Sequence, residues 1–116
     1  MNTESSFFTL LLLVGSIYTV VGMLTYVFPP KNINYLYGYR TNSSMKSQER
    51  WSFAQTYSSK LMIFLGISIA LLSCLGLFVS FSDKIDFYIG ISIFVLSIIA
   101  LFVKTERALK IKFPKD

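Results

Sequence analysis

Histidine is absent from this sequence of 116 residues, cysteine occurs once, and only six side chains carry a carboxylate. Without histidine, the chain cannot form the Ser-His or Cys-His pairs that activate nucleophiles, and most zinc sites lose a usual ligand. The single cysteine, Cys74, has no partner for an internal disulfide. We therefore assign no catalytic residue, and we predict neither a metal site nor a cofactor.

Charged residues are also scarce, at 15% of the chain, whereas hydrophobic residues make up 53%, far from the balance of soluble proteins. The apolar residues cluster in three runs, at 7–28, 61–82 and 85–103. Each run has close to the ~20 residues that a helix needs to cross the hydrocarbon core of a membrane. The sequence therefore predicts an all-α integral membrane protein with three transmembrane helices in a single domain. Asp86 is the one charge in these runs, so we expect no buried charge of the kind that marks an ion path.

The lysines and arginines predict how the three spans are oriented. Residues 1–6 contain none, residues 29–60 contain five, the connection at 83–86 contains one, and the basic tail at 104–116 contains five. Because cytoplasmic loops carry the excess of positive charge, we expect the N-terminus outside and both basic segments in the cytoplasm. The first run should remain a span, since no basic residue precedes it. The net charge of +5 then indicates anionic membrane lipids as partners and not nucleic acid.

The polar segment between the first two runs divides into a loop and a helix. The prolines at 29–30 should end the first helix, because proline has no N–H to donate. Residues 31–45 are typical of an irregular loop, and the oxygens at 42–44 could cap a helix that follows. We predict that this second helix runs from 45 to 82 and extends into the cytoplasm, with a kink near Ser58 as the alternative.

Two spacing patterns group residues on one face of a predicted helix. In the second helix, residues spaced three and four apart form one face: Trp51, Ala54, Ser58, Leu61 and Leu65. Small residues form stripes that let helices approach closely in lipid: Gly15, Thr19 and Gly22 in the first helix, and Gly66, Ala70 and Cys74 in the second. Trp51 alone is also typical of a membrane-interface anchor, and Arg50 is expected elsewhere on the surface.

The loop carries the residues best suited to bind a partner. Arg40 follows Gly38 closely, and its planar guanidinium fits a carboxylate or a phosphate. The hydroxyls of Thr41 and Ser44 add donors nearby. Two interpretations remain open, because Arg40 could instead pair with Glu49, the only acidic residue at 29–60, and hold the loop to the helix. A single carboxylate is weak support for catalysis, so we do not expect an enzyme.

These same residues resemble the signature segment of the SdpI family of bacterial integral membrane proteins. The pattern is a Gly-x-Arg-Thr turn, then a Ser or Thr, then a Trp about ten residues after the Thr, ahead of a membrane helix that contains a Gly. The positions that fill it are Gly38, Arg40, Thr41, Ser44, Trp51 and Gly66. The founding member is longer, with more spans, and Asn42 stands where the family often has Pro.

The resemblance implies a protein of the bacterial inner membrane with a role in immunity or signal transduction. The founding member protects its producer from a secreted killing peptide and holds a transcriptional repressor at the membrane. By similarity, the loop would bind a toxin peptide, a lipid headgroup or a regulator protein. The candidate ligand- or partner-binding residues are Gly38, Arg40, Thr41, Ser44, Glu49 and Trp51.

Two other functions remain as alternatives. The first is a membrane enzyme or lipid-handling protein that acts at the inner leaflet through Arg40 and Glu49. The second is a small structural subunit of a membrane complex. Three spans also leave much lipid-facing surface open, so we expect self-association into a homo-oligomer.

Overall fold

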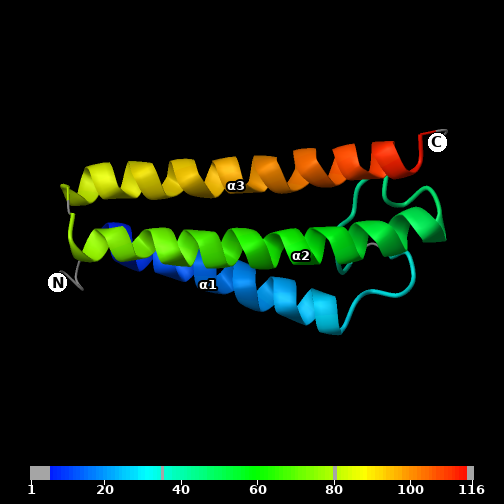
Figure 1. Cartoon of the computed structure of the whole chain (residues 1–116), viewed down its shortest axis with the longest axis horizontal. Helices are drawn as coiled ribbons and strands as arrows, with labels where there is room; N and C mark the ends of the chain where they lie inside the picture. Colours follow the sequence, from blue (N-terminus) through cyan, green and yellow to red (C-terminus); the bar gives the residue numbers. More distant parts are fainter. Residues whose placement is uncertain (1–5, 35, 80, 115–116) are drawn as a thin grey trace.

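The computed structural model describes residues 6–34, 36–79 and 81–114, and Figure 1 shows long helices lying side by side. The elements are α1 (Ser6–Val27), α2 (Gln48–Ser73), a short 3-10 helix η1 (Cys74–Leu77) that continues α2, and α3 (Asp83–Lys112). A loop joins α1 to α2 at one end of the molecule, which we name the loop end. The bundle is elongated, with extents of 50 × 24 × 20 Å.

Each long helix contains a stretch that is long and apolar enough to cross a membrane: Ser6–Val27, Gln48–Leu77 and Asp83–Lys112. Many large apolar side chains on these helices point outward, including Leu13, Phe64 and Leu96, which are 56%, 66% and 63% exposed. Such a surface suits lipid and not water. The predicted all-α fold with three membrane-spanning helices is confirmed, and no strand occurs in the ranges that the structure describes.

The start of the second helix differs from the prediction. α2 begins at Gln48 and not at Met45, because Ser47 adopts an extended conformation and its hydroxyl accepts a hydrogen bond from the backbone N of Arg50 at 3.1 Å. This is the usual geometry of an N-cap. The oxygens at 42–44 do not cap the helix; the hydroxyl of Ser44 accepts a bond from within the loop instead.

The ends of the helices are also now defined. α1 ends at Val27, just before the two prolines, as predicted. α2 is an unbroken α-helix through Ser58, and its 3-10 extension ends at Leu77, before the expected end at Ser82. α3 continues to Lys112, so most of the basic tail lies on the last turns of this helix. The remaining tail residues at 115–116, like residues 1–5, lie outside the described residues.

The backbones of α1 and α2 are in direct contact at their glycines. A Cβ added to Gly66 would lie 2.6 Å from the backbone N of Thr19 and 2.7 Å from the carbonyl oxygen of Gly15. A Cβ added to Gly15 would lie 2.7 Å from the backbone N of Ala70. The small-residue stripe on these two helices therefore packs as predicted, because only a missing side chain permits this approach.

The third member of the predicted stripe on α2 does not take part. Cys74 is exposed, and the contact with α1 passes to Gly76, where an added Cβ would lie 2.7 Å from the backbone N of Phe8. The reason is the change from α-helix to 3-10 helix at Cys74. A 3-10 helix has three residues per turn, so the four-residue spacing no longer stays on one face.

Polar groups hold α3 to α1. The hydroxyls of Tyr18 and Ser97 lie 2.7 Å apart. At the end opposite the loop, Asp86 accepts a hydrogen bond from the backbone N of Phe7 at 3.3 Å and is only 1% exposed. This corrects the expectation that no span would hold a buried charge. The carboxylate lies where α1 begins, and the first N–H groups of a helix have no partner within that helix.

We predict that Gly66→Ala destabilises the protein by about 1–3 kcal/mol, the usual cost of forcing an extra carbon into a packed site. The new methyl would meet the backbone of α1, which cannot move aside as a side chain can. Thermal unfolding of the purified protein in detergent measures the change. Gly90→Ala is the matched control, since its Cβ would meet only the side chain of Leu10, whose nearest atom would lie at 3.3 Å. Equal stability of the two variants would contradict the close contact.

Candidate functional site

The loop turns sharply at Gly38, and this turn requires glycine. Its φ is +98°, a backbone conformation that residues with a Cβ rarely adopt. An added Cβ would also lie 2.5 Å from the side-chain oxygen of Gln55 and 2.5 Å from Cγ of Pro30. Gly38 is thus a structural requirement of the turn that precedes Arg40.

A buried glutamine fixes the next residue of the loop onto α2. The backbone N of Tyr39 donates to Oε1 of Gln55 at 2.7 Å, and Nε2 of Gln55 donates back to the carbonyl oxygen of Tyr39 at 2.7 Å. Gln55 is 2% exposed, and these bonds satisfy groups that would be costly to bury alone. The amide therefore holds the loop backbone as a neighbouring strand would.

Glu106 of α3 holds the same part of the loop from the other side. Its Oε2 accepts a hydrogen bond from the hydroxyl of Tyr39 at 2.7 Å and another from the hydroxyl of Thr41 at 2.9 Å. Bonds to a charged carboxylate are stronger than those between neutral groups. Burial raises the pKa of the Tyr39 hydroxyl, and the hydrogen bond and negative charge of Glu106 raise it further. Tyr39 consequently remains a donor at neutral pH.

Thr41 and Ser44 bond to each other. The backbone N of Thr41 donates to the hydroxyl of Ser44 at 2.9 Å, and the backbone N of Ser44 donates to the hydroxyl of Thr41 at 3.1 Å. Ser44 is fully buried. Such local bonds compete with helix formation, which explains why α2 does not start here. Both candidate residues thus shape the loop, and Ser44 is shielded from any ligand outside it.

Trp51 and its neighbour Arg50 are buried, contrary to expectation. Trp51 is fully enclosed and its Nε1 donates to the carbonyl oxygen of Pro30 at 2.6 Å, so it is no membrane-interface anchor. Arg50 is 2% exposed. Its guanidinium donates to the carbonyl oxygens of Ser43, at 2.6 Å, and Phe113, at 3.2 Å, and lies over the ring of Phe113. Arg50 therefore ties the loop to the end of α3.

Arg40 and Glu49 are the two candidate residues with exposed side chains that carry charge. Glu49 lies in the first turn of α2, where a negative charge suits the helix N-terminus. Glu106, whose carboxylate accepts hydrogen bonds from the loop, was missed by sequence reasoning. One signal was available, because Glu106 is the single acidic residue among the basic residues at 104–114. Gln55 gave no such signal, since a glutamine on a polar helix is ordinary.

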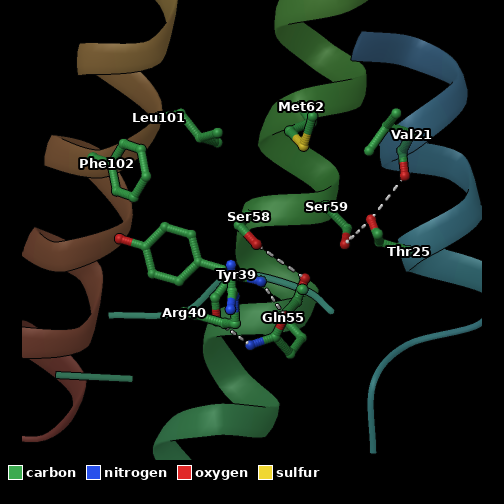
Figure 2. A pocket seen from close by; sticks show the side chains of 11 residues that line it. Val21, Thr25, Tyr39, Arg40, Gln55, Ser58, Ser59, Met62, Leu101 and Phe102 are labelled. Atoms are coloured by element: carbon green, nitrogen blue, oxygen red, sulfur yellow. Dashed lines mark hydrogen bonds between the residues drawn. The ribbon is translucent and has the colours of Figure 1, made fainter. Parts of the chain in front are cut away.

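A cavity of about 290 Å³ lies beside this loop, among residues of α1, α2 and α3. Figure 2 shows Arg40 and Gln55 at one end of it and Met62, Leu101 and Phe102 toward the other. The structure therefore brings Gly38 and Arg40 to the cavity, whereas the remaining sequence-predicted residues do not line it: Thr41, Ser44, Glu49 and Trp51.

The helices and the loop define a multi-pass membrane protein with a braced polar loop at one end of its spans. The model of the SdpI/YfhL protein family matches residues 31–104, and the chain belongs to this family. The match includes the loop, α2 and most of α3. The resemblance found in the signature residues is thus confirmed.

About half of the chain also aligns with a bacterial relative. The chain is 48% identical over 56 residues to the uncharacterized protein YfhL of Bacillus subtilis (strain 168). The aligned stretch covers 48% of this chain and 51% of YfhL, so the match spans about half the length of that relative. No solved structure matches the chain.

We predict that Glu106→Ala loosens the loop. Two hydroxyl donors lose their shared acceptor, which should cost about 1–3 kcal/mol. Hydrogen–deuterium exchange of residues 36–47 should therefore rise, and the thermal midpoint should fall. Glu106→Gln keeps a carbonyl acceptor and should show a smaller effect, while Arg107→Ala, at an exposed neighbouring position, should show none. Unchanged exchange in Glu106→Ala would show that the carboxylate does not hold the loop.

Proposed function

We propose that this protein is an immunity or signal-transduction factor of the bacterial inner membrane. In this proposal the loop between α1 and α2 binds a toxin peptide, a lipid headgroup or a regulator protein on the cytoplasmic side. Membership of the SdpI/YfhL family supports the general role. The observation that carries the proposal is the exposed Arg40 on a loop that α2 and α3 brace from two sides.

The bracing matters because it prepares Arg40 for binding. The two bonds between Gln55 and the backbone of Tyr39, and the bond that the hydroxyl of Thr41 donates to Glu106, fix the residues on both sides of Arg40. A loop that is already ordered loses little entropy when a partner binds. A guanidinium on such a loop is suited to a carboxylate or phosphate, whose oxygens accept its planar set of donors.

The proposed function depends on the orientation of the loop. The basic residues of the loop and of the last turns of α3 gather at the same end of the bundle, and the charge rule assigns such an end to the cytoplasm. In a Cys74→Ser background, Asn42→Cys should resist an impermeant thiol reagent added to intact cells. Lys84→Cys, at the opposite end, should react. The reverse pattern would place the loop outside and end the proposal as stated.

A deletion strain tests the immunity role and does not require the toxin to be identified. In co-culture with its parent, a strain that lacks the gene should be outcompeted if the parent secretes a killing peptide, and the intact gene should restore survival. We predict that Arg40→Ala fails to restore it. Loss of a charge-assisted hydrogen bond costs about 1.5–3 kcal/mol, which weakens binding by about tenfold or more.

The control is Lys31→Ala, which also removes an exposed cation from the loop. It should restore survival fully, and immunoblots of membranes should show both variants at the level of the intact protein. Full protection by Arg40→Ala at normal abundance would mean that Arg40 does not contact the partner. Low abundance of Arg40→Ala would instead support a structural role for the side chain.

A further inference from the structure

The cavity beside the loop has two chemically different ends. Arg40 and Gln55 lie at the end next to the loop, and the opposite end is apolar, lined by Val21, Met62, Leu101 and Phe102. α1, α2 and α3 each contribute at least one of these apolar side chains. A cavity that is charged at one end and apolar at the other matches the polarity of an amphiphile, which has a charged head and an apolar chain.

We propose that this cavity binds one alkyl chain of an anionic amphiphile, with the carboxylate or phosphate head at Arg40. The inference deepens the proposed function and rests on it, because it names the ligand class that the exposed Arg40 contacts. Such a ligand would be either a free single-chain amphiphile or a bilayer phospholipid that inserts one of its chains.

The choice of an anionic head follows from the charges and bonds around the cavity. Among the described residues that line it, Arg40 is the one with a charged side chain. The neutral polar groups already bond within the protein: the hydroxyls of Thr25 and Ser59 lie 2.7 Å apart, and Ser58 donates to the carbonyl oxygen of Gln55 at 3.3 Å. The head of a ligand is therefore selected by the charge of Arg40, whose guanidinium carries five N–H donors and can bind an anion while it keeps a bond within the protein.

The size of the cavity selects one chain. At about 290 Å³ it is at the lower limit of ligand sites, which measure roughly 300–1,000 Å³. That space suits one alkyl chain and not the two chains of a whole phospholipid. Val21 and Phe102, which line the cavity, are also 38% and 43% exposed. Because both lie on helices long and apolar enough to cross the membrane, this exposure suits entry of a ligand from the bilayer.

Photo-crosslinking tests the proposal on the full chain in phosphatidylcholine nanodiscs. The probe is a fatty acid with a diazirine in its chain, and mass spectrometry locates the labelled residues. We expect labels on cavity residues such as Met62 and Leu101. Excess dodecanoate or dodecyl phosphate should lower this labelling by about tenfold, whereas uncharged dodecanol should compete weakly, because it lacks the charge that pairs with Arg40.

Two variants with a matched control make the test specific. Arg40→Gln removes the charge from an exposed position and should lower cavity labelling by about tenfold. Leu101→Trp fills the cavity and should abolish labelling, while Ile99→Trp adds the same ring to α3 at a position 51% exposed and outside the cavity, and should leave it intact. If Leu101→Trp fails to fold, as thermal unfolding would reveal, Arg40→Gln decides the question.

The proposal is overturned if labels spread evenly over the lipid-facing helices, if dodecanol competes as well as dodecanoate, or if folded Arg40→Gln keeps full labelling. The lipid composition of the nanodisc distinguishes the two sources of the ligand, a bilayer phospholipid and a free amphiphile. Phosphatidylglycerol added to the bilayer should lower labelling if a phospholipid chain enters, and should leave it unchanged if only a free amphiphile fits. If the cavity is labelled but the strain that lacks the gene survives co-culture as well as its parent, the immunity role alone is refuted. If that strain is outcompeted but the cavity is not labelled, the amphiphile proposal alone is refuted.

Discussion

In lipid, apolar side chains gain nothing by leaving the solvent for each other, so helices associate through close contact and polar bonds. The contact between the backbones of α1 and α2 at Gly15 and Gly66 is therefore the constraint on which the rest of this structure depends. It fixes α2 against α1 over most of its length. With α2 fixed, Trp51 and Gln55 meet the loop that returns from α1, and the turn at Gly38 can close over them.

α3 is attached in a different way. Its apolar contacts include the buried Leu109, which packs with Tyr39 and Ala54. Polar contacts also fix it: Asp86 at the start of α1, Ser97 at Tyr18, and Glu106 at the loop. Arg50 adds a fourth at the carbonyl oxygen of Phe113. The cavity lies between Ser97 and Glu106, where Leu101 and Phe102 line it. A helix held at discrete points leaves room between them, which relates the polar bonding of α3 to the proposed binding site.

The loop shows why candidate residues can be recognised without their roles being known. Gly38, Arg40, Thr41, Ser44 and Trp51 were recognised from their spacing, but four of them serve the loop's own geometry: the turn at Gly38, the mutual bonds of Thr41 and Ser44, and the anchoring of Pro30 by Trp51. Arg40 alone among these five is both exposed and at the cavity with a charged side chain. Glu106 was missed because it lies some 65 residues away along the chain from Thr41.

The sequence by itself determined the three apolar helices, the end of α1 at its prolines, the small-residue contact and the family signature, because each depends on composition or on spacing within one segment. Tertiary structure alone decided that Arg50 and Asp86 are buried, that Cys74 turns away from α1, and that Glu106 bonds to the loop. These features depend on which groups meet across helices. The lipid environment restricts which groups can meet, since a polar group away from water must find a partner on another segment.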